Sequence, residues 1–231
     1  MGYSHADDVQ QSKRIILPYE KNEEYFIEEL GDVSVPWHYA FIKRLFDIIF
    51  SLIAIIILII PSLIIALIIK LTSEGHVLFK QERLGKDGVK FMILKFRTMY
   101  SDAEESVVKW SIGEDDRVTK FGGFLRKTRL DELPQLWNIL VNDMSLIGPR
   151  PERKVYYDEF ELYIHGFKER LKVKPGLTGY AQVYGGYYLK PEEKILYDLE
   201  YIKKRSLLMD CKIFFKTVTV LFTGEKKQTD S

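Results

Sequence analysis

Residues 48–69 read IIFSLIAIIILIIPSLIIALII and contain no charged side chain. Only Ser51, Pro61 and Ser62 lie outside the hydrophobic set, which leaves 19 of the 22 residues apolar. A helix that rises 1.5 Å per residue would make this run about 33 Å long, enough to cross the hydrocarbon core of a bilayer. The run argues against a purely soluble protein. Because the sequence has no second run of this kind, it also argues against a multi-span transporter.

The path of this run through a membrane is open to two interpretations. Proline removes a backbone hydrogen bond and clashes with the preceding turn, so Pro61 can bend or break the helix. Ser62 beside it can help to satisfy the freed backbone groups. Cations flank both ends, with Lys43 and Arg44 before the run and Lys70 after it, so the positive-inside tendency gives no direction. The residues alone favour a bent spanning helix, with a re-entrant helix as the alternative.

Charge is distributed unevenly along the chain. The net charge is +1, but residues 1–35 carry three cations and eight acids, so the rest of the chain carries +6. A basic body beside an apolar run suits partners that bear phosphate, such as anionic lipid or a nucleotide. The apolar run argues against a nucleic-acid partner. A single cysteine, Cys211, and four scattered histidines argue against an internal disulfide and a zinc site.

Composition divides the chain into four parts: an acidic N-terminal arm over 1–35, an interfacial segment and membrane helix over 36–70, a main body over 71–223, and a polar tail over 224–231. Strand-like residues on both sides of the turn Gly85–Gly88 predict an antiparallel hairpin over 76–97. Helical spacing and helix-start signals predict short helices over 101–110, 133–140, 191–205 and 208–222. The N-terminal arm is expected to be poorly ordered or loosely docked, with room for one short acidic helix over 21–30.

The expected fold class is therefore a helix-rich α+β body beside a membrane helix. Residues 145–152 and 174–179 are expected to be loops, because they are rich in proline and glycine. The segment 208–222 is amphipathic, so it could lie on a membrane surface or pack in the core, and we favour the membrane surface.

The strongest candidate for chemistry is the pair Asp131 and Glu132, at the start of the predicted helix over 133–140. At a helix start, two adjacent carboxylates can bend toward one point beyond the helix end. That point would suit Mg²⁺, which prefers one or two carboxylates together with waters and substrate phosphates. A carboxylate can also attack phosphorus as a nucleophile. The simpler alternative is that both acids cap the helix and complement its dipole.

Several cations occur in the same part of the sequence as the acids: Lys95, Arg97, Arg126, Arg129 and Arg150. A diphosphate needs several cations, and arginine offers a two-pronged fit to phosphate oxygens. We predict that Lys95 and Arg97, two residues apart on a strand, point to one face. A strand edge protected by charge is the alternative. The stretch Gly148, Pro149, Arg150, Pro151 would hold its arginine on a stiff loop.

Five blocks, in order, resemble the bacterial sugar transferases, the monotopic polyprenol-phosphate phosphoglycosyl transferases. The resemblance covers about residues 41–222, and the blocks are Lys43–Asp47, Lys95–Met99, Arg126–Leu136, Asp143–Pro151 and Lys174–Val183. It implies transfer of a sugar 1-phosphate from a UDP-sugar to polyprenyl (undecaprenyl) phosphate. The products would be a polyprenyl-diphospho-sugar and UMP, at the first step of polysaccharide, capsule or glycoconjugate assembly.

The resemblance also implies roles for individual residues. Asp131 would be the nucleophile that carries the phospho-sugar covalently, and Glu132 the second catalytic carboxylate, which we expect to assist deprotonation of the acceptor. Mg²⁺ would lie against both acids. The expected substrate-binding residues are Lys95, Arg97, Arg126, Arg129, the loop Gly148–Pro151, and Gln182.

A membrane topology follows from the same resemblance. The apolar segment would be a re-entrant helix broken at Pro61 and Ser62, and the main body would be a catalytic domain on the cytoplasmic face of the bacterial inner membrane. The lipid bilayer is then a partner, and homo-oligomerisation is left open. Two alternatives stay under consideration: a non-catalytic basic scaffold on the same membrane anchor, and a glycosyltransferase that releases UDP.

Overall fold

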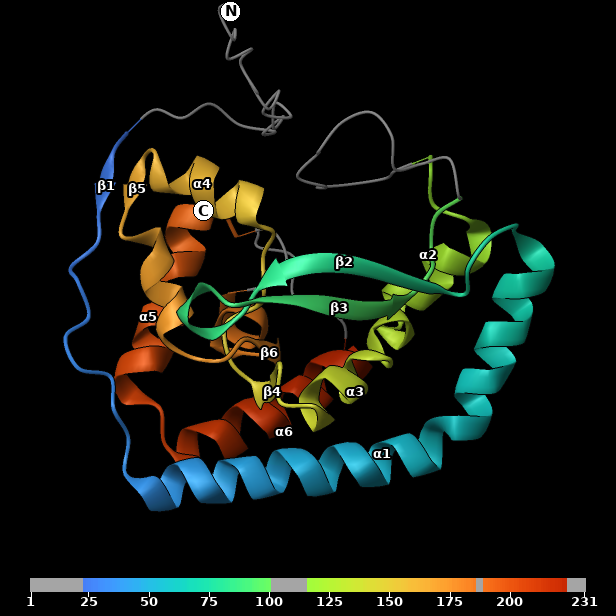
Figure 1. The fold of residues 1–231 in the computed structure, drawn as a ribbon, viewed down its shortest axis with the longest axis horizontal. Helices are drawn as coiled ribbons and strands as arrows, with labels where there is room; N and C mark the ends of the chain where they lie inside the picture. Colours follow the sequence, from blue (N-terminus) through green and yellow to red (C-terminus); the bar gives the residue numbers. More distant parts are fainter. Residues whose placement is uncertain (1–22, 101–115, 186–188, 224–231) are drawn as a thin grey trace, which may run out of the picture.

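The structure is a computed structural model that describes residues 23–100, 116–185 and 189–223 (Figure 1). Its α-helices are α1 (Trp37–Thr72), α2 (Lys120–Lys127), α3 (Gln135–Leu140), α4 (Lys154–Glu161), α5 (Pro191–Lys204) and α6 (Leu207–Thr223). Shorter turns are η1 (Lys86–Gly88), η3 (Leu130–Glu132), η4 (Phe167–Lys172) and the π-helical η5 (Ala181–Gly185). The helix-rich α+β expectation is confirmed. The predicted helix over 101–110 and the tail over 224–231 lie outside the described residues.

The apolar run forms the larger part of α1, which continues without interruption through Pro61. Figure 1 shows that α1 bends, so that its last turns rise toward α2 while its first turns run beneath the body. Proline is the usual cause of such a bend. The helix is long and apolar enough to cross a membrane, and most of its apolar window is exposed.

Both arms of α1 pack on the same body. In the first arm, the Asp47 carboxylate accepts a hydrogen bond from the backbone N–H of Leu146 at 3.0 Å. In the second arm, Ile65 and Ile69 are buried in a small core with Leu125. The bent helix therefore contacts the body on both sides of its apolar middle.

The strands form three two-stranded sheets within the described residues. β2 (Leu78–Leu84) and β3 (Lys90–Phe96) are antiparallel, as the hairpin pattern predicted. β4 (Ser145–Ile147) pairs in parallel with β6 (Gly176–Thr178). The prediction of simple loops over 145–152 and 174–179 is therefore wrong in part. Strand pairing between segments about 30 residues apart has no local signal in either segment.

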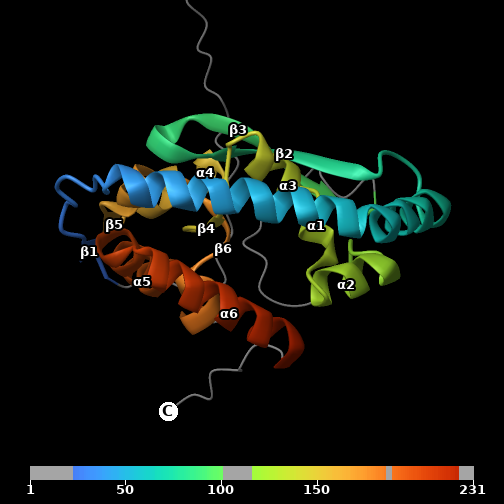
Figure 2. The same cartoon turned by 90° about the horizontal axis from the view of Figure 1, so that it is seen from below.

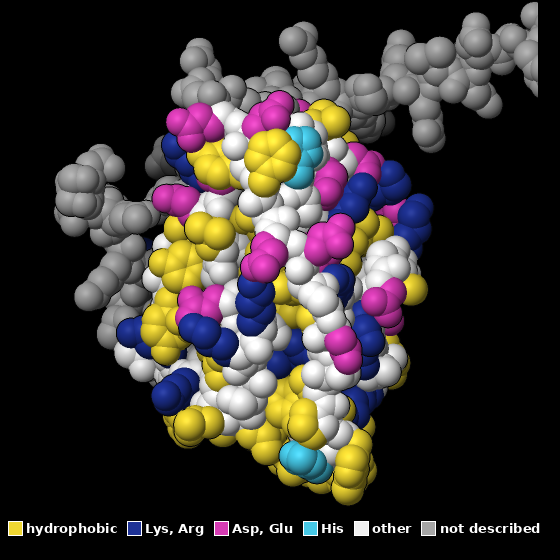
Figure 3. Space-filling view, turned by 90° about the vertical axis from the view of Figure 1, so that its left-hand side faces the viewer, with side chains coloured by type: hydrophobic (Ala, Val, Ile, Leu, Met, Phe, Trp, Pro, Cys, Tyr) yellow, Lys and Arg dark blue, Asp and Glu magenta, His cyan; other side chains and the backbone are white. Residues whose placement is uncertain are grey.

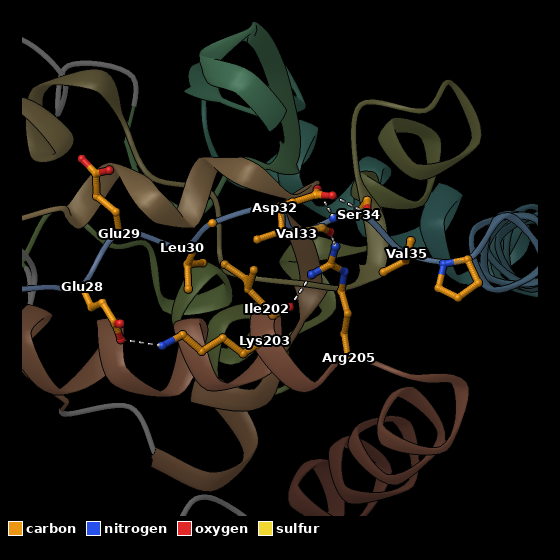
Figure 4. Close-up of a pocket in the computed structure, with 12 residues that line it drawn as sticks. Glu28, Glu29, Leu30, Asp32, Val33, Ser34, Val35, Ile202, Lys203 and Arg205 are labelled. Carbon is orange, nitrogen blue, oxygen red and sulfur yellow. Dashed lines mark hydrogen bonds and ion pairs between the residues drawn. The ribbon is translucent and has the colours of Figure 1, made fainter.

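Residues 23–36 form an extended N-terminal strap on the body, and the predicted helix over 21–30 is wrong for its described part. β1 (Tyr25–Phe26) pairs in parallel with β5 (Ile164–His165). Leu30 is buried, and its carbonyl accepts a hydrogen bond from Lys172. Figure 4 shows a cavity between the strap and the end of α5, where Arg205 reaches the carbonyl of Val33. The volume of this cavity is about 400 Å³.

Helix α6 packs on α1 and also exposes an apolar face. Ile213 is fully buried, and the ring of Phe214 lies edge-on to the ring of Phe50, with centroids 5.3 Å apart. On its other face, Phe215 and Leu208 are exposed. Figure 2 shows α1 and α6 on the same side of the molecule, and Figure 3 shows apolar side chains at the end where α1 begins. The segment 208–222 thus contributes both to the core and to an apolar surface.

Candidate active site

The acid pair, Asp131 and Glu132, lies on η3, a single turn between α2 and α3. The residue before this turn, Arg129, has a left-handed backbone with φ of 60°. This conformation is uncommon for a side chain other than glycine, and such residues often occur near functional sites. Both acids are buried, although acidic residues are almost never fully buried without partners. The two carboxyl groups therefore require an electrostatic explanation.

Glu132 is held by two cations. Its Oε1 accepts hydrogen bonds from Lys95 Nζ and from an Arg150 guanidinium nitrogen, both at 2.7 Å. Burial opposes ionisation of Glu132, but Arg150 and Lys95 outweigh it and hold the pKa of Glu132 well below its usual range. Glu132 is therefore ionised at neutral pH and fixes the ends of two basic side chains beside Asp131.

Asp131 is in a different state. Within the part of the chain that the structure describes, no side chain or backbone group donates a hydrogen bond to its carboxylate. Burial raises the pKa of Asp131, and neighbouring Glu132 raises it further, against the opposing charges of Lys95, Arg150 and Arg126. Among the described residues, Asp131 is thus surrounded by positive charge without being hydrogen-bonded to it, and none of these residues occupies its oxygens.

Lys95 is positioned by β3, which is fastened to α3. The side-chain amide of Asn138 accepts a hydrogen bond from the N–H of Leu94 at 3.0 Å and donates one to the carbonyl of Met92 at 2.8 Å. Burial lowers the pKa of Lys95, while its contact with Glu132 opposes this shift. The strand that carries the lysine and the helix that follows the acids are therefore joined by two hydrogen bonds of one side chain.

The other predicted cations are divided between two places. Arg126 lies near Asp131 and donates from Nε to the Thr98 hydroxyl at 2.9 Å. Arg97 follows the last residue of β3, and its guanidinium donates to the carbonyl and the hydroxyl of Ser73, both at 2.7 Å. The expectation that Arg97 joins Lys95 at the acids is therefore not met by the contacts of the described residues. Arg97 instead ties the end of α1 to the hairpin.

The proline loop, Gly148–Pro151, comes directly after β4 and brings Arg150 to the acids. Gly148 is required by close packing, because a Cβ at this position would lie 2.4 Å from the carbonyl oxygen of Lys174. Gln182, on η5, lies near the same glycine, since a Cβ on Gly179 would meet both the Gly148 carbonyl and the Gln182 amide oxygen. That oxygen is buried and has no hydrogen-bond partner among the described residues.

Sequence reasoning missed a second group of charges behind the proline loop, of which Glu152, Arg170 and Asp198 are buried and Arg83 and Lys194 partly buried. Glu152 pairs with Lys194 at 2.7 Å and with Arg83 at 3.3 Å. Burial opposes ionisation of Glu152, but Lys194 and Arg83 outweigh it and lower its pKa to about 2. The one local signal was the spacing of Lys194 and Asp198, four residues apart on a helix and hence on one face.

No group of three or more potential metal-ligating His, Cys, Asp or Glu side chains occurs in residues 23–100, 116–185 and 189–223. The cavity of Figure 4 is lined by the strap and the end of α5, and neither Asp131 nor Glu132 lines it. The candidate site is therefore the acid pair and its cations. A divalent cation would find one carboxylate already available there, that of Asp131.

Comparison of the sequence with protein-family models identifies the family of the chain. A family model described as bacterial sugar transferase matches residues 38–224. The chain therefore belongs to the bacterial sugar transferase family, and the resemblance noted from the sequence is confirmed. A long apolar helix together with this family indicates association with a membrane.

Curated relatives have related names. The chain is 43% identical over 199 residues to a UDP-N-acetylgalactosamine-undecaprenyl-phosphate N-acetylgalactosaminephosphotransferase of Aeromonas hydrophila, covering 85% of this chain and 47% of that protein. It is 44% identical over 182 residues to a UDP-glucose:undecaprenyl-phosphate glucose-1-phosphate transferase of Escherichia coli strain K12, covering 77% and 39%. A protein of the latter name from Caulobacter vibrioides is 41% identical over 188 residues, covering 79% and 70%. The chain spans less than half the length of the first two relatives.

Proposed function

We propose that the protein is a phosphoglycosyl transferase that moves a sugar 1-phosphate from a UDP-sugar to polyprenyl phosphate. The products are a polyprenyl-diphospho-sugar and UMP, and the reaction initiates assembly of a polysaccharide or glycoconjugate. The names of the relatives support the substrate classes. The observation that carries the proposal is the contrast within the acid pair: Glu132 is bonded to two cations, whereas Asp131 is left without a hydrogen bond from the described residues.

The proposed reaction has two steps, with Asp131 as the nucleophile. A carboxylate oxygen of Asp131 attacks the phosphorus that bears the sugar, and the bond from that phosphorus to the bridging oxygen breaks. UMP leaves with the electron pair, and an acyl phosphate joins Asp131 to the phospho-sugar. A phosphate oxygen of the polyprenyl phosphate then attacks the same phosphorus and releases the Asp131 carboxylate. Burial raises the pKa of Asp131, and the ionised form of a more basic carboxyl group is the stronger nucleophile.

We assign Glu132 a positioning role. Its pKa is held well below the usual range, so it is a weak base. An acceptor phosphate monoester has a second pKa near 6 and is already largely deprotonated at neutral pH. The expected role in deprotonating the acceptor is therefore not favoured. Glu132 instead fixes Lys95 and Arg150, whose remaining N–H groups are available to the diphosphate oxygens.

We propose that Mg²⁺ binds at Asp131 together with the substrate diphosphate. The carboxylate of Asp131, which accepts no hydrogen bond from the described residues, fits a cation that uses one or two protein carboxylates and takes its other ligands from water and phosphate. Glu132 fits less well, because one of its oxygens is already shared by two cations. When bound, the ion would neutralise charge on the diphosphate.

We further propose that α1 is re-entrant and that the body lies on the cytoplasmic face. The support comes from contacts on both sides of the apolar middle of α1. Asp47 bonds to β4 before it, and Arg97 bonds to Ser73 after it. A straight spanning helix would carry one of these ends to the opposite side of the bilayer, away from its partner on the body.

The first test measures nucleotide release. Purified protein is incubated with Mg²⁺, undecaprenyl phosphate and each of a set of UDP-sugars, and UMP and UDP are measured separately. We expect UMP from one or two donors, lost in Asp131→Asn and kept in the control Asp158→Asn, an exposed acid on α4. UDP in place of UMP would identify a glycosyltransferase. No nucleotide release from any donor would favour the scaffold, which needs no Asp131.

Two further measurements test the finer points. Protein quenched after exposure to the donor alone should carry a phospho-sugar on Asp131, detected by peptide mass spectrometry, and unmodified Asp131 during turnover would refute the covalent step. The topology test uses two variants of the Cys211→Ser protein, each with a single new cysteine, at the exposed position Glu28 or at the exposed position Lys80. Impermeant reagent in intact cells should label neither position, and labelling of one but not the other would mean that α1 spans the membrane.

A further inference from the structure

Hydrogen bonds hold the backbone of the proline loop and of Glu152, the residue that follows it. Four consecutive carbonyl oxygens, from Pro149 to Glu152, each accept a hydrogen bond. The donors are the N–H of Gly176 at 2.9 Å, the Arg170 guanidinium at 3.0 Å, the Arg83 guanidinium at 3.3 Å and the N–H of Leu84 at 3.1 Å. Backbone groups alone hold the first and the last. Two arginines hold the middle pair: the fully buried Arg170 bonds to the Arg150 carbonyl, and the partly buried Arg83 bonds to the Pro151 carbonyl.

Arg170 is the most enclosed of these donors. Its side chain has no exposed surface, and its Nε donates to Asp198 at 2.7 Å, a carboxylate that is 1% exposed. Its guanidinium lies 4.9 Å from the ring centre of Phe167 and 5.7 Å from that of Tyr157, within the range of cation–π attraction. Arg170 cannot reach a substrate. Any effect it has on the reaction must pass through the groups that it touches.

A contribution to stability does not explain well why Arg170 and Asp198 form a buried ion pair. Taking two charges out of water is costly, and replacing a buried ion pair by well-packed apolar residues is often neutral or stabilising. The pair does provide something that an apolar pair cannot, a charged donor at a fixed point under the Arg150 carbonyl. We propose, on the basis of the function proposed above, that Arg170 is a positioning residue: with Asp198 it fixes the peptide of Arg150, so that the Arg150 guanidinium meets Glu132 and the substrate diphosphate.

The path from Arg170 to the reacting phosphorus is short. The Arg150 carbonyl bonds to Arg170, and the Arg150 guanidinium, whose side chain is 32% exposed, bonds to Glu132 at 2.7 Å. A shift at one end of this residue is passed to the other. A misplacement of about 1 Å in a positioned group can cost about 100-fold in rate.

The variant Arg170→Lys tests this directly, because lysine keeps the charge but cannot bond to a carboxylate and a carbonyl in the same fork geometry. We expect kcat for UMP release to fall about 10- to 100-fold. Arg205→Lys is the matched control, since that guanidinium also bonds to backbone carbonyls, those of Ile202 and Val33, but away from the site. Thermal melts of both variants verify folding, and Asp198→Asn, which keeps its shape, replaces Arg170→Lys if the latter fails to fold.

A double mutant separates positioning from general destabilisation. In an Arg150→Ala background, Arg170→Lys should change kcat by less than about 3-fold, because the group that it positions is gone. A fall as large as in the wild-type background, or a wild-type background effect no larger than that of Arg205→Lys, would overturn the proposal.

A second readout does not depend on activity. Phenylglyoxal modifies accessible arginines, and peptide mass spectrometry gives the rate at Arg150. We expect Arg170→Lys to speed modification of Arg150 several-fold, because Arg150 is released from Glu132, and Arg205→Lys to leave it unchanged. If wild-type protein releases no UMP, the proposed function fails. The modification rate at Arg150 then decides the positioning role: faster modification supports it, and an unchanged rate refutes it.

Discussion

Replacing Asp210 should detach α6 from α1. The Asp210 carboxylate accepts hydrogen bonds from Tyr39 at 2.9 Å, from Lys43 at 2.9 Å and from Tyr201 at 2.8 Å. Side-chain exposure is only 18% for Lys43 and 10% for Asp210. In Asp210→Ala, a mostly buried ammonium and two buried phenols would lose this acceptor together, and Lys43 and Tyr201 would keep only the Tyr201 hydroxyl and the Ile147 carbonyl, each at 3.3 Å.

The size of the effect follows from this geometry. Removing one partner of a buried ion pair costs about 3–5 kcal/mol, because it leaves an uncompensated charge. Partial exposure of Lys43 lets water recover some of this cost, so we expect a loss of about 3 kcal/mol. For a chain of this size, each kcal/mol lowers Tm by about 2–4 °C. The expected decrease in Tm is therefore roughly 6–12 °C.

The assay is thermal unfolding in detergent micelles, followed by circular dichroism. Glu200→Ala is the control, because Glu200 pairs with Lys204 at 2.9 Å on the exposed side of α5, where water screens the charges. Adding Lys43→Met to Asp210→Ala should recover part of the lost Tm, since it removes the unpaired charge. A decrease in Asp210→Ala no larger than in Glu200→Ala, or a further decrease on adding Lys43→Met, would refute the reasoning.

Four other outcomes are expected. Asp131→Asn should abolish UMP release without lowering Tm, because burial disfavours the ionised form of this carboxyl; a lower Tm would show that the charge stabilises the fold. Burial opposes ionisation of Glu152, but its cationic partners outweigh burial and lower its pKa from near 4.5 to about 2. The ionised Glu152 therefore stabilises the fold above pH 4.5, and this stabilisation is lost as the pH falls toward 2. Glu152→Gln should flatten the dependence of Tm on pH in that window, and an unchanged slope would count against the pairing. Gly148→Ala should cost about 1–3 kcal/mol, measured by thermal melts, and reduce UMP release, because the new methyl group meets backbone. Removing Mg²⁺ with EDTA should stop UMP release reversibly, and activity that persists in EDTA would argue against a metal at Asp131.

The sequence was sufficient to predict that the acid pair and three of its cations lie close together in the candidate site, and to predict most helices. Asp131 and Glu132 were recognisable by their place at a helix start, and Lys95, Arg126 and Arg150 do gather around them. Helices α5 and α6 follow the predicted ranges closely because their periodicity is strong. These features depend on spacing along one segment, which a sequence displays directly.

What the sequence could not provide depends on partners far away in the chain. Arg97 differs from Lys95 in its surroundings, not in its type, since the strand ends before it and Ser73 offers two acceptors. Arg170 looks like any surface cation in a basic stretch, and only the fold shows that it is buried against Asp198. The extended strap was misread as helix because its backbone partners, Tyr163 and His165, lie about 140 residues later.

The ion pair between Lys43 of α1 and Asp210 of α6 has a consequence for biosynthesis, because the two residues are 167 positions apart. At a synthesis rate of about 5–20 residues per second, Asp210 is added roughly 8–33 s after Lys43, its partner on the apolar helix. Throughout that interval no completed body can cover the helix. A nascent chain arrested before residue 210 should therefore already sediment with membranes, and the body would fold onto a helix that the bilayer has held from the start.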